Sequence, residues 1–542
     1  MNHAIDQNII TKAANSDTVK LFLSLSKEEQ AQYLIAYRTY VYGFGLVLVD
    51  ETRKTSTNVA TPDYSNGHAP INQVGYCDAL RDANYTDVVR PNVDTLYDPA
   101  WMDLSEGPLV LTVPEMKVAG ANRYYILQMM DAYSNVFKSI GTRTGYTDGP
   151  YTLFIKGPND TDATPPNTGD EYVVIQSLTN TVWMLGRVYT TGESDDVAAV
   201  NALQAQMTLT PADQYPRSVS GYTPPVGSID NTLTEPPLIR VQNMGTEGLL
   251  NQMLQLWVNN PPIMAQNNLG KEQDERILKE MTQIGINYPT TTTWQMDRQG
   301  FSDDLMTLMG KISTQVKNDF TYMKNHTGAP SIALNQLKQH LELVYLPNSN
   351  KQSTHNWVAI TNKRMGDYQS HYMLRSFIAF SGLGANLVLD AIYPAISINQ
   401  TETNTYTITF QNDIINNPPI DRHGFWSLTM YGNDQELVAT PTNADGITKR
   451  YSVSSKSELK RLTFNKNTRK YEQHKYGKVI IFVQPEPPTD DMLASNWLPS
   501  PSVPSSLSGK TMALMLRFYW PKEKVLQSKW EYPVIAPTSA PV

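Results

Sequence analysis

The chain of 542 residues has a single cysteine, Cys77, and no long apolar run. One thiol excludes an intramolecular disulfide and a zinc site built from cysteines, and we interpret Cys77 as a buried or loop thiol. No stretch approaches the roughly 20 apolar residues that a membrane-spanning helix needs. Residues 1–10 lack the basic start and apolar core of a signal peptide. We therefore expect no membrane span, and either a mature form or export by another route.

Charged residues are also scarce, at 18% of the chain. The 44 Lys and Arg are outnumbered by 52 Asp and Glu, so the formal net charge is −8. This balance argues against non-specific nucleic-acid binding. Asn, Thr, Gln and Tyr are abundant instead, and we expect a surface that relies on neutral polar groups.

Familiar catalytic motifs are missing as well. The sequence contains no phosphate-binding loop, no dinucleotide-binding glycine fingerprint and no Gly-x-Ser-x-Gly elbow. Its eight histidines form no His-Glu-x-x-His motif. His355, His371 and His423 could meet an acid in a folded metal site, but a surface or satisfied core role is favoured for each. We predict no metal and no cofactor.

The densest run of aromatic, Arg and Asp residues extends over residues 90–143. Within it, the proline-bracketed aliphatic run 108–114 predicts a strand, and residues 123–131 predict a second. Alternation puts Arg123 and Asp131 on one face of the second strand but at opposite ends, so they are not expected to pair.

The charged side chains of this run are Arg90, Asp94, Asp98, Asp103, Arg123, Asp131 and Arg143. They have two interpretations. The favoured interpretation is that Arg–Asp pairs tie loops to a β framework. The other is a ligand site, in which Arg supplies a planar fork for a carboxylate, a phosphate or sugar hydroxyls while Tyr and Trp supply stacking faces.

Each half of the chain contains its own set of long motifs. The N-terminal ones are Asn92–Tyr97, Ala100–Leu104, Pro108–Pro114, Arg123–Tyr125, Ile140–Arg143 and Val182–Arg187. The C-terminal ones are Pro418–Pro419, Phe425–Tyr431, Arg450–Ser452, Asn496–Pro501 and Leu516–Lys522. The first set resembles the domain-of-unknown-function 1254 family, and the second resembles its usual C-terminal partner, the 1214 family. His423-Gly424 and Ser500 depart from the usual pattern without affecting the implied fold.

The resemblance implies a mainly β chain with helical segments, in which a helical region joins two β-sandwich domains of jelly-roll character. We expect an N-terminal helical segment over residues 1–50, a first β-sandwich over 51–191, a mainly helical bridge or insert over 192–395 and a second β-sandwich over 396–542. The family has no settled activity, so the resemblance implies no chemistry.

Local patterns place individual elements within this frame. Ser26 followed by Glu29 is typical of a helix start. Helices are predicted over 195–207, 248–259, 272–285, 303–325 and 373–389, and further strands over 406–410, 425–431, 478–483 and 511–519.

Two sets of aromatic and hydrogen-bonding residues are candidate sites. The first is Asp94, Tyr97, Trp101, Arg123, Tyr125, Asp131 and Arg143. The second is Trp426, Tyr431, Arg450, Tyr451, Asn496, Trp497, Arg517, Tyr519 and Trp520. Aromatic faces beside charged hydrogen-bonding groups often hold sugars or flat anions. Large aromatics also build β-sandwich cores, and that alternative is favoured for both sets.

Two functions fit these observations. The first is a binding or surface-assembly protein that recognises a glycan, a small polar ligand or a protein partner, with self-association into a homo-oligomer. An extracellular, periplasmic or particle-surface location suits it better than a cytoplasmic enzyme role. The second is a hydrolase or lyase acting on a carbohydrate or small polar metabolite. In that case Asp94 or Asp131 acts as acid or base, and Arg123 or Arg143 holds an anion.

Overall fold

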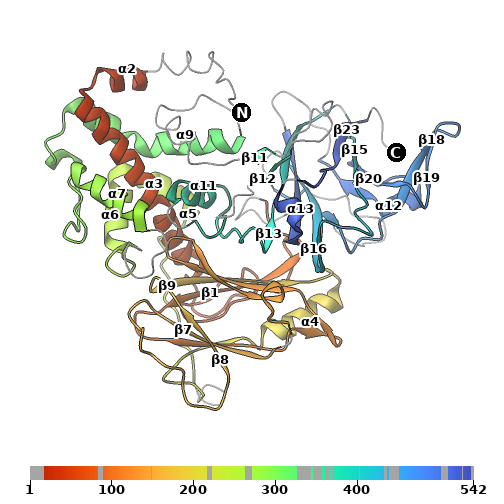
Figure 1. Ribbon diagram of the computed structural model, residues 1–542, viewed down its shortest axis with the longest axis horizontal. Helices are drawn as coiled ribbons and strands as arrows, with labels where there is room; N and C mark the ends of the chain where they lie inside the picture. The colour runs from red at the N-terminus through yellow and green to blue at the C-terminus, as the bar shows by residue number, and fades with distance from the viewer. Residues whose placement is uncertain are drawn as a thin grey trace.

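The computed structural model is mainly β, with several sheets and a body of helices (Figure 1). This confirms the predicted fold class at that level. The residues that it describes are 17–83, 90–147, 149–216, 222–262, 271–325, 344–345, 357–359, 365–368, 371–401, 403–432, 436–438, 451–501, 511–527 and 529–538.

The helical body is organised around one long helix, α3 (Lys27–Ser56). The predicted capping box is present, because Ser26 and Glu29 cap one another at its start. Residues 39–51 of α3 are all buried, as expected of a helix covered on every side. The other helices of this body are α2 (Asp17–Ser24), α5 (Pro237–Asn243), α6 (Gly245–Leu256), α7 (Lys271–Met281), η3 (Thr282–Ile284), η4 (Met296–Arg298), α8 (Asp303–Gly310), α9 (Ile312–Asn325) and α11 (Tyr372–Gly382).

Two helix predictions were too long. The helix expected over 303–325 is two helices, because α8 ends at Gly310, a poor helix former, and α9 begins at Ile312. The helix expected over 373–389 ends at Gly382. Gly384 then has a φ of +84°, a left-handed conformation that turns the chain out of the helix. Residues 383–393, here called the Gly384 segment, lead on to the second β region.

The first β region consists of two four-stranded sheets. One has the order β1 (Thr95–Asp103), β9 (Thr181–Tyr189), β5 (Tyr125–Asp131), β6 (Val136–Gly141). The other has the order β10 (Thr208–Pro211), β2 (Leu109–Val113), β7 (Tyr151–Lys156), β8 (Tyr172–Gln176). Both predicted strands of the 90–143 run are present, as β2 and β5. The short pair β3 (Lys117–Val118) and β4 (Ala121–Asn122), η1 (Thr142–Thr144) and α4 (Ser194–Gln204) lie around them.

These two sheets lie one above the other, and their facing side chains form one core (Figure 1). Leu96 of β1 and Leu127 of β5 meet Leu111 of β2 and Leu153 of β7 in this core. The opposite face of the β1-β9-β5-β6 sheet points toward the helical body and the second β region.

The second β region also has two sheets around one core. The larger contains β11 (Val344–Tyr345), β12 (Val358–Ala359), β14 (Ala395–Asn399), β22 (Thr511–Pro521), β16 (Ile420–Tyr431) and β17 (Ser452–Ser454), with β13 (Ala391–Ile392) beside β22. The other contains β19 (Lys470–Gln473), β18 (Arg461–Asn465), β20 (Lys478–Gln484), β15 (Tyr406–Thr409) and β23 (Val534–Pro537), with β21 (Trp497–Pro499) beside β20. Helices α12 (Asp491–Ala494) and α13 (Glu523–Leu526) complete it.

Strand alternation decides what each face of β16 and β22 presents. Trp426 and Phe518 point into the core of the second β region. Their neighbours Ser427 and Arg517, which are paired across the two strands, point the other way. That outward face packs against the first β region. Within the part of the chain that the structure describes, no helix is long and apolar enough to cross a bilayer.

Candidate functional site

The two β regions meet at a buried junction made by residues 90–95 and the outward face of β16 and β22. Asn92 donates its side-chain amide to the hydroxyls of Thr95 (2.8 Å) and Tyr519 (2.7 Å). The hydroxyl of Ser427 donates to the carboxylate of Asp94 at 2.5 Å. Because water is excluded from these contacts, each unpaired group would be costly, and the bonds hold the two regions in one register.

Arg517 is the centre of this junction and is only 3% exposed. Its guanidinium donates to the hydroxyls of Thr429 (2.9 Å) and Tyr431 (2.5 Å) and to the carbonyls of Arg90 (3.1 Å) and Pro91 (3.3 Å). The planar fork is thus used to bind backbone and hydroxyl oxygens within the protein. Its donors are already engaged by protein atoms.

Asp94 supplies the negative charge of the junction. Burial raises the pKa of this carboxyl above its usual range, and the nearby Arg517 and the hydrogen bond from Ser427 partly oppose the rise. Asp94 therefore has a structural explanation, since it is held by groups from the second β region.

Aromatic rings continue the junction toward the sheet of the first β region. Phe425 and Tyr519 are stacked with their centroids 4.1 Å apart. Tyr124 and Tyr189, from the first β region, contact Phe425 at 5.5 and 4.7 Å. Tyr393 of the Gly384 segment lies edge-on to Tyr519 at 6.4 Å. This packing connects the junction to the Gly384 segment, which covers part of the β1-β9-β5-β6 sheet.

Arg187 lies beneath the Gly384 segment, on the face of β9 that points away from the core of the first β region. It is 6% exposed, and one of its terminal nitrogens donates to the carbonyl of Gly384 at 2.9 Å. The side chain of Gln128 donates to the same carbonyl, also at 2.9 Å. The guanidinium lies over the ring of Tyr97, 5.3 Å from its centroid. Among the described residues no carboxylate pairs with Arg187, so its positive charge is buried without a counter-ion.

The conformation of Gly384 is required for this arrangement. A Cβ atom at this position would lie 2.9 Å from a methyl group of Leu185 and 3.3 Å from the ring of Trp183. The φ of +84° also disfavours any other residue. The backbone can therefore approach the sheet closely enough to meet Arg187 and Gln128.

Two further polar pairs flank Arg187. Arg143 forms an ion pair with Asp390, which is 1% exposed. The phenol of Tyr393 donates to the side-chain oxygen of Asn386 at 2.5 Å. Burial raises the pKa of Tyr393 to about 12, with Arg187 partly opposing the rise, so this phenol keeps its proton at neutral pH.

Several polar atoms around Arg187 are buried without a partner among the described residues. They are Arg187 Nη1, Gln128 Oε1, Asn386 Nδ2, Asp390 Oδ2, Trp101 Nε1 and Trp183 Nε1. The two indoles are stacked, with centroids 4.7 Å apart and planes within 6°. Most buried polar groups in proteins are satisfied, so such a concentration between the sheet face and the Gly384 segment marks a place where a bound molecule or water would be accommodated.

The structure distributes the sequence-predicted residues over several places. Asp94, Tyr97, Trp101, Arg143, Tyr431, Arg517 and Tyr519 lie at the junction or on the adjacent face of the first sheet. Arg123 pairs with Asp196 of α4 at 2.6 Å, at the edge of this region. Tyr125 points into the core of the first β region.

Asp131 has a turn-capping role at the far end of β5. Its carboxylate accepts the backbone N–H groups of Tyr133 and Asn135, both at 2.9 Å. Burial raises its pKa to about 6, and the contacts from Asn135 and the charge of Arg375 oppose the rise. These hydrogen bonds give Asp131 a structural role, because its carboxylate holds the turn that follows β5.

Trp426 and Trp497 belong to the second β region. Trp426 packs in the second core against Phe410 at 5.5 Å. Trp497 is on β21 and donates its indole N–H to the carbonyl of Gln484 at 2.9 Å. Arg450 and His355 lie outside the described residues. His371 is the residue just before α11, whereas His423 is exposed on β16 and its ring is stacked on that of Trp520. Within the described ranges, no group of three or more His, Cys, Asp or Glu is arranged for a metal ion.

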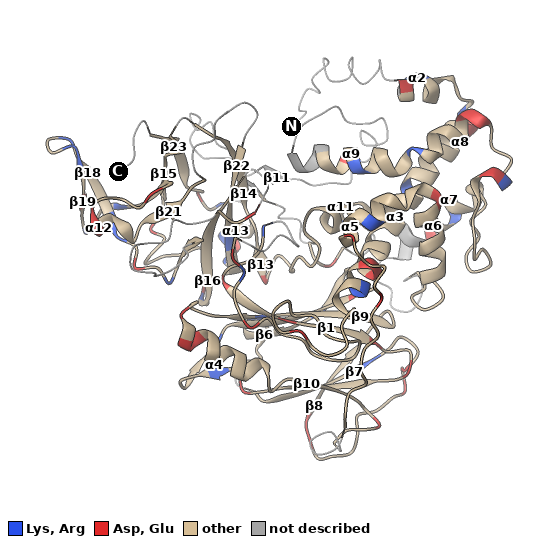
Figure 2. Cartoon of the chain, turned by 180° about the vertical axis from the view of Figure 1, so that it is seen from behind, with Lys and Arg blue, Asp and Glu red and all other residues tan. Residues whose placement is uncertain are grey.

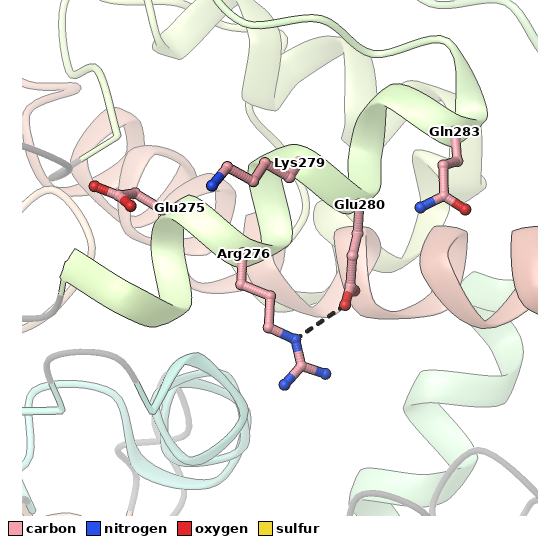
Figure 3. A pocket seen from close by; sticks show the side chains of 5 residues that line it. All are labelled: Glu275, Arg276, Lys279, Glu280 and Gln283. Atoms are coloured by element: carbon pink, nitrogen blue, oxygen red, sulfur yellow. Dashed lines mark hydrogen bonds and ion pairs between the residues drawn. The ribbon is translucent and has the colours of Figure 1, made fainter.

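A shallow hollow lies on the helical body, far from Arg187. It is lined by Glu275, Arg276, Lys279, Glu280 and Gln283 on and just after α7 (Figure 3). Glu280 accepts ion pairs from Arg276 (3.0 Å) and Arg38 (2.7 Å). Because its central charges are paired and it is open to solvent, we assign it no function.

Comparison with known proteins places the junction between two recognised regions. Residues 71–211 match the family model of a protein of unknown function, DUF1254, and residues 397–523 match that of another, DUF1214. The chain carries both domains in the predicted order. Arg187 lies in the first and Arg517 in the second, while the Gly384 segment lies between the two matched regions. The junction thus joins the two matched regions of this chain.

One solved structure supports the fold. The crystal structure of the VPA0106 protein from Vibrio parahaemolyticus is 16% identical, with a TM-score of 0.56 over 94% of this chain and 100% of that one. A putative uncharacterised protein from Burkholderia cenocepacia is 11% identical, with a TM-score of 0.38 over 97% of this chain and 98% of that one. A comparison with curated proteins gives no match.

Sequence reasoning missed Arg187, Gln128 and the Gly384 segment as site residues. A signal was available for Arg187, because a charged residue interrupts the apolar strand 182–189 and a buried arginine needs a partner. No local pattern shows that residues 383–393 cover this strand, since they are about 200 residues away in the chain.

Proposed function

We propose that this protein binds a small ligand with a carboxylate or similar anionic group at Arg187, beneath the Gly384 segment. The observation that carries the proposal is the buried guanidinium of Arg187, which has a terminal nitrogen without an acceptor and no carboxylate partner in the described part of the chain. A buried charge without a counter-ion costs several kcal/mol, and an anion accepting from Arg187 would remove that cost.

The surroundings suit a small, partly flat ligand. Tyr97 lies beside the guanidinium, and the stacked indoles of Trp101 and Trp183 have unpartnered N–H donors on the same sheet face. The phenol of Tyr393 adds another polar group nearby. Arginine beside aromatic faces is a common way to bind carboxylates, because it combines charge, a fork of donors and stacking.

The Gly384 segment is the part of the chain that contacts Arg187 from outside the sheet, through the carbonyl of Gly384. Leu389, within this segment, is 50% exposed. We infer that a ligand enters when this segment moves away from the sheet.

The finer parts of the sequence-based hypotheses stay predictions. A jelly-roll-like sandwich in each β region is supported by the two cores that pairs of sheets share. Recognition of a glycan or a protein partner and homo-oligomer formation rest on the sequence alone. The hydrolase or lyase alternative has less support, because Asp94, Asp131 and Arg123 each have a structural partner and do not face one another.

Binding measurements with a neutral variant test the proposal. Isothermal titration with small carboxylates and their amide counterparts should give binding of one or more carboxylates and none of the amides. Arg187→Gln, which removes the charge but keeps a donor, should abolish that binding. Its unfolding temperature without ligand should equal or exceed that of the native protein, because an uncompensated buried charge is gone.

Arg123→Gln is the matched control, since it removes a half-buried arginine, just before β5, that is already paired with Asp196. It should leave carboxylate binding unchanged. A lowered unfolding temperature for Arg187→Gln, together with no carboxylate binding by the native protein, would show that Arg187 is purely structural.

A further inference from the structure

A hairpin in the second β region carries an unusual concentration of positive charge. Residues 456–478 contain eight Lys or Arg and two acids, in a chain whose net charge is −8. The centre of this segment is the hairpin formed by β18 and β19, which pair from Leu462↔Gln473 to Asn465↔Lys470. The hairpin projects at the end of the molecule away from the helical body, and blue residues mark its tip (Figure 2).

The basic side chains at the tip are exposed and unpaired. Lys466, Arg469 and Lys470 are all exposed, and none of them forms an ion pair with a described residue. The one acid of the hairpin, Glu472, instead accepts hydrogen bonds from Asn465 and Thr468. Three like charges within a few residues repel one another, so their free energy falls when an anionic surface neutralises them.

Exposed aromatic rings accompany these charges. Phe464 is 47% exposed on β18, and Tyr476, just after β19, is 79% exposed. The ammonium group of Lys475 lies over the Tyr476 ring at 5.3 Å. Lysines with long apolar stems beside exposed Tyr and Phe are the combination that settles at the headgroup level of a bilayer.

We propose that the β18–β19 hairpin docks the protein onto an anionic phospholipid surface. A clustered positive charge on an otherwise acidic chain orients the molecule, because the hairpin is attracted to the surface while the rest is repelled. Helix α12, which contributes Met492 and Leu493 to the packing under the hairpin, bears Asp491, so the contact is made by the tip and not by that side. This inference is independent of ligand binding at Arg187.

Vesicle co-sedimentation tests the proposal. The full chain should sediment with phosphatidylcholine vesicles that contain about 30% phosphatidylserine, at low ionic strength, and not with pure phosphatidylcholine vesicles. Binding should disappear at about 0.5 M salt, because screening removes the attraction. The triple variant Lys466→Gln, Arg469→Asn, Lys470→Gln should weaken binding by one to two orders of magnitude. Asn suits position 469, where φ is +56°.

A variant with the same charge change elsewhere is the control. Arg298→Asn, Lys311→Gln, Lys317→Gln alters three exposed residues of the helical body and should bind as tightly as the native protein. Equal loss in both variants, or no binding to the anionic vesicles, would overturn the proposal. Binding to duplex DNA but not to vesicles in the same buffer would identify the partner as nucleic acid and would also overturn it.

Discussion

At the scale of single residues, Asp98 shows how burial controls protonation in this protein. It lies on β1 and faces the core of the first β region, with both carboxylate oxygens buried and unpartnered among the described residues. Burial raises its pKa to about 8, and the Gln204 side chain partly opposes the rise. Asp98 is therefore neutral in the folded protein at pH 7.

This makes stability depend on pH. The unfolded chain releases the Asp98 proton near its ordinary pKa of about 4, whereas the folded chain keeps it up to about pH 8. The contribution of Asp98 to stability is complete below pH 4 and is lost as the pH rises toward 8. The unfolding temperature of Asp98→Asn should decline less between pH 5 and pH 8 than that of the native protein. Identical pH profiles for the native protein and Asp98→Asn would contradict a raised pKa.

Cys77 lies near Asp98, and burial raises the pKa of its thiol to about 11. The thiol is buried, as predicted from the sequence.

At the scale of elements, the Gly384 segment converts a sheet face into a candidate site. Gly384→Ala should lower the free energy of unfolding by about 1–3 kcal/mol, because the new methyl group meets Leu185 and the φ is left-handed. Carboxylate binding should weaken in the same variant, since the carbonyl that orients Arg187 and Gln128 moves. Urea unfolding and titration measure the two effects.

Gly382→Ala is the matched control, two residues earlier. A Cβ there meets no atom within 4 Å, so the variant should be as stable as the native protein. Equal stability of the two glycine variants would show that the backbone of the segment adapts, and that the close approach to the sheet is not required.

The sequence predicted individual strands better than it predicted the candidate site. Strands β2, β5, β15 and β16 lie where alternation and β-branched content predict strands, although β16 begins at Ile420, before the predicted residue 425. The site could not be predicted in the same way, because its contacts join distant parts of the chain. Asp94 and Ser427 are 333 residues apart, and only folding brings their two motifs together.

At the scale of the whole molecule, the junction makes the two β regions one structural unit. Arg517→Met would remove the buried donor to the carbonyl of Arg90 and to the hydroxyls of Thr429 and Tyr431. We expect a loss of about 3–5 kcal/mol in the free energy of unfolding, measured by urea denaturation. Arg461→Met, which breaks a half-exposed pair with Asp413, should cost at most about 1 kcal/mol. Similar losses in both would mean that the junction adds little to stability.

The central claim is that an anionic ligand binds at Arg187, and locating such a ligand tests it most directly. Crystals grown with bromoacetate or a bromobenzoate would reveal the bromine by its anomalous scattering. We predict a bromine peak beneath the Gly384 segment, with the carboxylate accepting from Nη1 of Arg187. Bromine peaks confined to the protein surface, with Arg187 unchanged beneath the segment, would contradict the claim.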